Sequence, residues 1–271
     1  MNETGAAAAA GDTAATAFVL RLGDDALVAG HRLAETEGSG LWPGTADDAA
    51  AHDAGAEAAR IARSLLRLAR SLLAYAGRME EQLTGVLRTE EDLVRNRSAD
   101  QFHNLQLVEL PNTDLAHTVV RQLLFSAYTL ELYTALTAST DETLADIART
   151  AVRELPFHRD HAVRWALRLG AGDDDRRRLG DALEEAWPCT GELFLSDEIA
   201  RTAAETGFGV DPARLRPAWE AVVDGALREA RLSRPGPVPV AESAAMCGRA
   251  GVHPEPFDRT LADIRRDRAP G

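Results

Sequence analysis

Lysine is absent from the sequence. All 30 basic residues are arginines, and 43 acidic residues give the 271-residue chain a formal net charge of −13 at pH 7. An acidic chain repels the phosphates of nucleic acids and of anionic membranes, so we expect neither a nucleic acid nor a membrane as a partner. A local group of arginines can still receive an anionic ligand.

Cysteine is scarce as well. Cys189 and Cys247 do not form a CxxC motif, and two cysteines are too few for a disulfide framework, which fits a reduced, cytoplasmic protein. The first residues, MNETGAAAAAGDTAATA, lack the positively charged start of a signal peptide. We interpret residues 1–16 as a disordered, Ala-rich tail. Residues 17–271 are then one helical domain with a Pro-rich segment at 233–257.

Alternating strand patterns of Val, Ile and Thr are nearly absent, whereas the good helix formers Ala, Leu, Arg and Glu are abundant, which predicts an all-α fold. The most apolar stretch covers residues 114–138 and starts at Asp114, a good N-cap. Apolar residues occupy every side of this predicted helix, which is typical of a helix buried inside a protein. We therefore expect a central helix about 37 Å long that other long helices surround.

The remaining pattern predicts further helices at 17–37, 46–82, 98–110, 141–170, 176–206, 211–232 and 258–266. Pro156 is expected to kink the helix at 141–170, and Pro188 is expected to bend the next one. We expect Asp24 and Asp25 at the surface. The helix at 46–82 has one apolar stripe, and no acidic residue occurs between Glu57 and Glu80. Its other faces carry Arg60, Arg63, Arg67, Arg70 and Arg78.

A bundle of long helices with inward charges suggests a ferritin-like di-iron site. Such a site takes a Glu from each of two helices and a Glu-x-x-His motif from each of two more. The sequence contains no Glu-x-x-His motif. Asp114 and His117 resemble part of one, but an N-cap with a first-turn histidine is the favoured interpretation.

Other candidate ligands are isolated. Glu154, His158 and His161 share one helix face, where a Glu–His hydrogen bond or an interface pair is favoured over a metal. Glu131 is expected to pair with a core arginine, because a buried carboxylate needs a partner. The helix at 46–82 offers no central carboxylate. We therefore predict a ferritin-like bundle with no catalytic, cofactor-binding or metal-binding residue in this chain.

Motifs of other enzyme classes are missing. There is no Gly-rich phosphate loop and no G-x-S-x-G motif. Cys189, beside a proline, is interpreted as a small core residue. The stretch at 248–253 could make an anion-binding turn, although a plain C-terminal loop is the favoured interpretation.

Several stretches resemble one protein family. They are LRLGD at 20–24, LLAYAG at 72–77, FHNLQLVELPNTDLAHTVVRQ at 102–122, His158 with Arg164-Trp165 and Arg168-Leu169-Gly170, and WPCTGELFLSDE at 187–198. Weaker similarity continues through 211–220 and 248–255. The chain resembles the PaaC family, the C subunits of the multicomponent phenylacetyl-CoA epoxidases (1,2-phenylacetyl-CoA monooxygenases), over nearly its whole length from Phe18.

The resemblance implies a ferritin-like fold without a catalytic centre. It implies that a sister protein, the catalytic subunit, holds the di-iron centre and epoxidises the aromatic ring of a CoA thioester with O2. It also implies a hetero-oligomer in which a reductase subunit delivers electrons from NADPH and small accessory subunits take part. The expected function is thus a non-catalytic structural subunit that supports the catalytic one in phenylacetate catabolism.

Two alternatives stay open. One is an oxygenase with a degenerate metal site built from Glu131, Glu154, His158 and Glu192. The other is a member of a related aryl-CoA pathway that binds a CoA thioester through arginines at the subunit boundary. For the surface that meets the catalytic subunit, we expect the long helix faces at 61–78 and 115–138.

Overall fold

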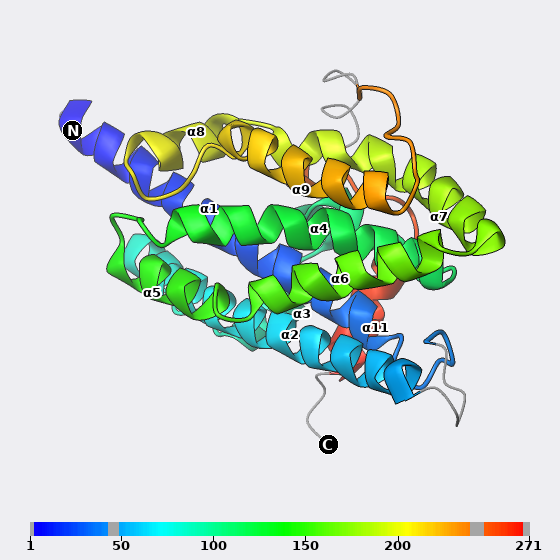
Figure 1. The fold of residues 1–271 in the computed structure, drawn as a ribbon. Helices are drawn as coiled ribbons and strands as arrows, with labels where there is room; N and C mark the ends of the chain where they lie inside the picture. The colour runs from blue at the N-terminus through cyan, green and yellow to red at the C-terminus, as the bar shows by residue number, and fades with distance from the viewer. Residues whose placement is uncertain (1–2, 43–48, 239–246, 268–271) are drawn as a thin grey trace.

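The computed structural model describes residues 3–42, 49–238 and 247–267 (Figure 1). These residues form helices and irregular connections, with no β-strand in the described ranges, so the predicted all-α fold is confirmed. The α-helices are α1 (Glu3–Ala34), α2 (Ala49–Thr84), α3 (Glu90–Arg95), α4 (Leu115–Leu136), α5 (Glu142–Ala151), α6 (Leu155–Gly170), α7 (Asp173–Ala186), α8 (Glu198–Glu205), α9 (Arg216–Glu229) and α11 (Phe257–Asp267). Short 3-10 helices are η1 (Ala99–Gln101), η2 (Gln106–Glu109), η3 (Trp187–Phe194), η4 (Pro212–Leu215) and η5 (Gly248–Ala250).

Helix α4 is the centre of the bundle, as the sequence predicts. It runs through the middle of the molecule with α9 above it and α6 in front (Figure 1). Asp114 caps it by accepting the His117 backbone N–H at 2.9 Å, which confirms the predicted start. Every residue from Thr118 to Leu130 is buried. In the part of the chain that the structure describes, no helix is long and apolar enough to span a bilayer.

Helices α1 and α2 pack against each other along their length. Glycines allow close approach here, since a Cβ atom at Gly23 would lie 2.7 Å from Cδ2 of Leu73 and one at Gly30 would lie 3.0 Å from Cγ of Leu66. The expected tail at 1–16 is wrong for the described residues, since α1 begins at Glu3 and Ala14 and Ala15 are buried. Alanine has the highest helix propensity, so a helix anchored in the core extends readily through this run.

Pro156 and Pro188 lie at helix starts in this fold, and the kinks predicted at these prolines are therefore breaks between helices. Residues 141–170 form two helices, α5 and α6, and Pro156 lies in the first turn of α6, where its missing N–H is not needed. Residues 176–206 likewise divide into α7, η3 and α8. The helix predicted at 98–110 is wrong. That segment holds two short 3-10 turns, and its backbone bonds to carboxylates of other elements.

Those carboxylates are buried and belong to a network from α1, η2 and η3. Asp24 is fully buried and bonds to Arg97 at 2.5 and 2.9 Å, while Asp25, 4% exposed, bonds to Arg249 at 2.7 and 3.1 Å. The expected surface position of both aspartates is therefore wrong. Burial raises the pKa of Asp25 to about 6, and the facing guanidinium of Arg249 opposes that rise.

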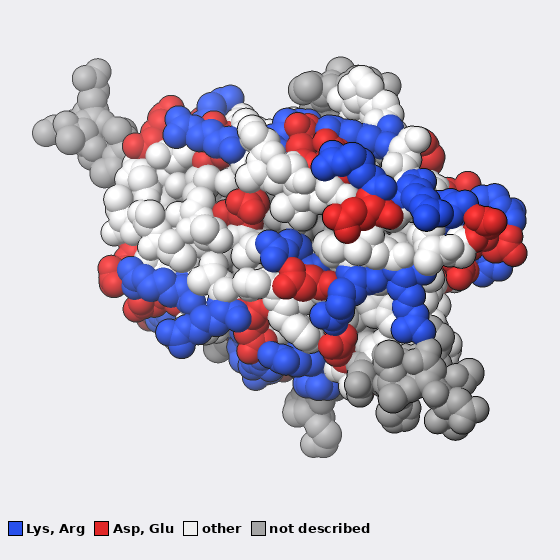
Figure 2. Space-filling view, viewed as in Figure 1, with Lys and Arg blue, Asp and Glu red and all other residues white. Residues whose placement is uncertain are grey.

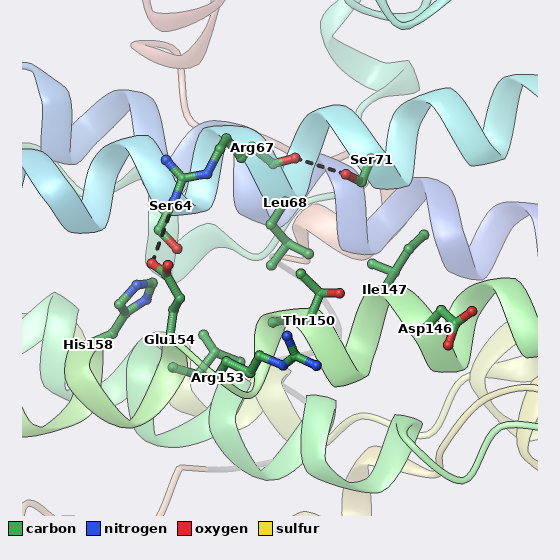
Figure 3. Close-up of a pocket in the computed structure, with 12 residues that line it drawn as sticks. Ser64, Arg67, Leu68, Ser71, Asp146, Ile147, Thr150, Arg153, Glu154 and His158 are labelled. Atoms are coloured by element: carbon green, nitrogen blue, oxygen red, sulfur yellow. Dashed lines mark hydrogen bonds and ion pairs between the residues drawn. The ribbon is translucent and has the colours of Figure 1, made fainter.

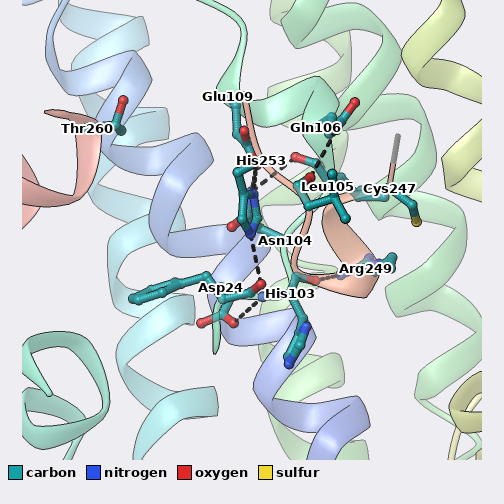
Figure 4. Close-up of polar contacts among 12 residues, drawn as sticks. Asp24, His103, Asn104, Leu105, Gln106, Glu109, Cys247, Arg249, His253 and Thr260 are labelled. Atoms are coloured by element: carbon teal, nitrogen blue, oxygen red, sulfur yellow. Dashed lines mark hydrogen bonds and ion pairs between the residues drawn. The ribbon is translucent and has the colours of Figure 1, made fainter. Parts of the chain in front are cut away.

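Two buried glutamates, Glu109 and Glu192, complete this network, and Figure 4 shows Glu109 beside His253. Glu109 contacts His253 at 2.6 Å and accepts a hydrogen bond from the Asn104 amide at 2.6 Å. Glu192 accepts the backbone N–H groups of Gln106 at 2.8 Å and Arg249 at 2.9 Å. The segment at 248–253 is thus an anion-binding turn, and the anions that it binds are carboxylates of the same chain.

The network ties two irregular segments to the helices. The backbone N–H groups of His103 and Leu105 bond to Asp24 at 3.1 Å and Asp25 at 2.8 Å, which places the 102–110 segment against α1. Gly248 is required at the contact, since a Cβ there would lie 2.0 Å from the Asn104 carbonyl oxygen. In this region ion pairs and hydrogen bonds to carboxylates therefore hold the segments together, whereas apolar packing holds the helices together elsewhere in the bundle.

Removing one partner of the buried Asp25–Arg249 ion pair should destabilise the protein more than replacing both partners does. We expect Arg249→Met to lower the free energy of unfolding by about 3–5 kcal/mol at pH 7.5, because it leaves Asp25 buried without its cation. The double variant Asp25→Asn, Arg249→Met should lose less than the sum of the two single variants. Urea unfolding followed by circular dichroism measures all four proteins. Additive losses would contradict the coupling of the two side chains.

Candidate functional site

The interior of the bundle is the first place to look for a metal centre. A di-iron site needs carboxylates and imidazoles that converge from four helices. The interior between α1, α2, α4 and α6 encloses only about 10 Å³. Its apolar lining consists of Leu22, Ala26, Leu65, Leu68, Phe125, Leu132 and Leu155.

Few oxygen atoms reach this interior. Thr129 and Tyr133 contribute hydroxyl groups, and Asp25 contributes one carboxylate, which Arg249 and the Leu105 N–H already engage. Burial also raises the pKa of the Tyr133 hydroxyl well above its usual value, so it stays protonated and is a poor metal ligand. The residues present therefore do not fit a di-iron centre.

The candidate ligands from the sequence do not come together. Glu192 belongs to the buried network with Arg249, whereas Glu154 and His158 line a surface groove. Glu131 is half-buried and makes no hydrogen bond or ion pair with any described residue, so the expected arginine pair is wrong. Across residues 3–42, 49–238 and 247–267, no group of three or more His, Cys, Asp or Glu side chains is arranged to hold a metal ion.

Asp114 and His117 have the structural role that the sequence predicts. Besides the cap, Asp114 contacts the His117 ring at 2.7 Å, and the other ring nitrogen lies 3.1 Å from Glu185 of α7. Burial opposes the charged imidazole, but the two carboxylates outweigh it and raise the pKa of His117. This cluster fastens the start of α4 to α7.

A groove between α2 and the α5–α6 junction is a candidate binding site. It has a volume of about 560 Å³ and opens to solvent (Figure 3). Ser64, Arg67 and Ser71 come from α2, and Arg153 and Glu154 come from the turn that separates α5 from α6. The groove does not follow from the sequence pattern, which predicts one continuous helix there, because the break between α5 and α6 shapes its wall.

Two charged residues face each other across the groove. Arg67 lies 3.5 Å from Glu154, and this ion pair joins α2 to the α5–α6 turn (Figure 3). Asp146 is drawn toward Arg149 of its own helix instead. Arg153 is exposed and makes no ion pair with any described residue. The groove can therefore accept an additional anionic group beside Arg153.

His158 lies at the inner end of this groove. It is 3% exposed, and its Nε2 atom has no hydrogen-bond partner among the described residues. The expected hydrogen bond between Glu154 and His158 is therefore wrong. Burial lowers the pKa of His158 to about 4, and the nearby positive charges of Arg60 and Arg67 also act in that direction, while Glu154 opposes them. The imidazole is neutral at pH 7.

Acid should destabilise the protein through His158. Because its folded pKa of about 4 lies below the ordinary value of 6.5, its contribution to stability is complete above pH 6.5 and is lost as the pH falls toward 4. The full loss amounts to about 3 kcal/mol. We expect His158→Gln to flatten the decrease in unfolding free energy between pH 6.5 and 5.0, measured by urea unfolding.

His117→Gln is a matched control with the opposite sign. Its folded pKa is raised, so its contribution is present below pH 6.5 and is lost at higher pH. Removing it should therefore leave the slope between pH 6.5 and 5.0 close to that of the wild type and change the pH dependence only above pH 6.5. Equal slopes for the two variants would contradict the assignment of the groove histidine as a neutral, buried group.

Comparison with known proteins identifies the family to which this helical bundle belongs. Residues 1–269 match the family described as phenylacetic acid catabolic protein. The chain is 36% identical over 251 residues to the C subunit of the 1,2-phenylacetyl-CoA epoxidase of Escherichia coli K12, and the match covers 92% of this chain and 94% of that protein. Both matches span nearly the whole sequence and confirm the resemblance that its motifs indicate. The chain belongs to the phenylacetic acid catabolic protein family, and its long-helix bundle is the ferritin-like architecture that the sequence predicts.

Proposed function

We propose that this chain is the non-catalytic structural subunit of a multicomponent di-iron monooxygenase that epoxidises the aromatic ring of phenylacetyl-CoA. In this proposal it binds and stabilises the catalytic subunit, which holds the iron. A reductase subunit supplies electrons from NADPH, and small accessory subunits complete the cytoplasmic complex. The similarity to the E. coli epoxidase protein supports the complex, and the bundle interior supports the division of labour.

The observation that carries the proposal is the chemistry of that interior. Leucine, alanine and phenylalanine occupy the space between α1, α2, α4 and α6, and the one carboxylate that lines it is held by Arg249. Iron in such sites is bound by carboxylate oxygens and imidazole nitrogens. An interior of this kind suits a packed scaffold. The oxygenase alternative built from Glu131, Glu154, His158 and Glu192 receives no support: Glu154 and His158 line the groove, Glu192 lies in the buried network, and among the described residues no three such side chains are arranged to hold a metal ion.

One expected interaction surface has to be corrected. Helix α4 cannot meet the catalytic subunit through a long face, because its residues from Thr118 to Leu130 are buried by helices of this chain. Helix α2 differs, since Arg60, Arg63 and Arg67 are exposed on it. Of the two faces that the sequence analysis favours, only the one on α2 is open to a partner.

The alternative that this chain binds a CoA thioester has one specific observation in its favour. The groove of about 560 Å³ offers Arg67 and Arg153 to an anion. However, Arg67 already contacts Glu154, which reduces the positive charge available to a phosphate group. Salt-sensitive binding of CoA to the isolated chain would support this alternative.

Reconstitution tests the proposal. We expect this chain to elute from a sizing column together with the catalytic subunit of the same organism. With the reductase and NADPH, epoxidation of phenylacetyl-CoA should require the catalytic subunit, and it should fall at least about tenfold when this chain is omitted. The isolated chain with the reductase should show no turnover. Full activity of the catalytic subunit without this chain, or turnover by this chain alone, would contradict the proposed role.

A further inference from the structure

We propose that one face of α2 is the docking surface for a carboxylate-bearing helix of the catalytic partner. This surface, the arginine face, consists of Arg60, Arg63, Arg67, Arg70 and Arg78. The inference rests on the proposed function, because it names the chemistry by which the partner is bound. The evidence is the geometry of the face, its unbalanced charge and the groove beside it.

The five arginines lie on one side of the helix. Their spacings of three, four, three and eight residues place them within about 80° of one another around the helix axis. From Arg60 to Arg78 the face extends about 27 Å. All five are exposed, whereas Ile61, Leu65 and Leu72 on the opposite side are buried in the core. The arginine face is therefore a continuous surface stripe.

The charge of this stripe is not balanced within the chain. Arg67 pairs with Glu154 at 3.5 Å and Arg70 pairs with Glu90 at 3.3 Å. The other three, Arg60, Arg63 and Arg78, make no ion pair with any described residue. Arg60 and Arg78 lie over the rings of Phe157 and Tyr75, at 4.4 and 5.5 Å from the ring centroids. In Figure 2, blue side chains with some red ones among them cover the lower part of the molecule, where Figure 1 places α2 and α5.

The imbalance contrasts with other arginines of the chain. Arg149 contacts both Glu142 and Asp146, and Arg234 contacts both Glu220 and Asp224. On α2, by comparison, no acidic residue lies between Glu57 and Glu80. Like charges at three- and four-residue spacing destabilise an isolated helix, so external carboxylates at matching spacing would relieve this repulsion.

A protein partner suits the face better than a nucleic acid. The chain carries a net charge of −13, and at distances beyond the arginine face this charge repels a long polyanion. A helix with carboxylates every three or four residues presents its negative charge over the same length of about 27 Å and no further. Short-range complementarity of this kind also fixes the register of two helices.

The groove enlarges the contact. A stripe about 27 Å long and about 10 Å wide covers roughly a third of the area of about 800 Å² that each partner of a stable complex buries. Ser64, Arg67 and Ser71 belong to both the edge of the stripe and the wall of the groove. On the far wall, exposed Arg153 adds positive charge.

Charge reversal tests the docking surface. The variant Arg63→Glu, Arg78→Glu removes no ion pair with a described residue, so its fold should be preserved, as circular dichroism and urea unfolding can verify. We expect its dissociation constant for the purified catalytic subunit to rise about 100-fold relative to the wild type, because repulsion slows association and weakens the complex. Arg63→Gln, Arg78→Gln should show a smaller rise. Binding by the wild type should weaken with salt, and binding by the Gln variant should depend less on salt.

The control is Arg178→Glu, Arg228→Glu, which reverses two exposed arginines on α7 and α9, on the other side of the bundle from α2 (Figure 1). It changes the net charge by the same amount and should alter the dissociation constant less than about threefold. Equal weakening by both variants would overturn the docking surface, as would unchanged binding by the α2 variant, and the proposed function would stand in either case.

Two further outcomes separate the possible occupants. If the wild type does not bind the catalytic subunit, the proposed function fails and this inference fails with it. If sedimentation shows that the wild type self-associates through the arginine face, or if the face binds a short RNA more tightly than it binds the catalytic subunit, the occupant is not an acidic helix of the partner and the inference is overturned.

Discussion

Four buried carboxylates set the conditions for the rest of this structure. A buried charge is stable only with a cation or several hydrogen-bond donors beside it, and helix α1 places Asp24 and Asp25 inside the bundle. Arg97 and Arg249 meet these two aspartates, while backbone N–H groups of the 102–110 segment complete their shells. Glu109 and Glu192 extend the same network. These contacts hold two segments without a long helix, 102–110 and 248–253, in one conformation.

Because buried charges need partners, the interior has one region of matched charged groups and a separate apolar region. Near η2 and η5, charged side chains are matched with one another, and among the described residues they form no cluster that could hold a metal ion. In the space between α1, α2, α4 and α6, leucines and a phenylalanine pack instead. This apolar space offers no set of ligands for iron, whereas the exposed arginines of α2 face solvent.

Much of the fold follows from periodicity, because burial on every side of α4 and the cap at Asp114 are local properties of the sequence. The network does not follow from it. Asp24 and Asp25 look like surface charges in a sequence, since Arg249, which neutralises Asp25, is 224 residues away along the chain. The 98–110 segment looks helical for the same reason, as its hydrogen bonds go to distant carboxylates. At the groove, the missed break between α5 and α6 depends on Pro156 starting a helix. The sequence also gives no sign that Glu131 lacks an arginine partner among the described residues.

The central claim is that this bundle supports an oxygenase without holding its metal. Iron per chain measures it most directly, by elemental analysis of the protein expressed alone in iron-replete medium. The account predicts an iron content near zero, because the described residues that line the interior offer one carboxylate, already held by Arg249, and no imidazole. About two irons per chain, as a di-iron site requires, would contradict it.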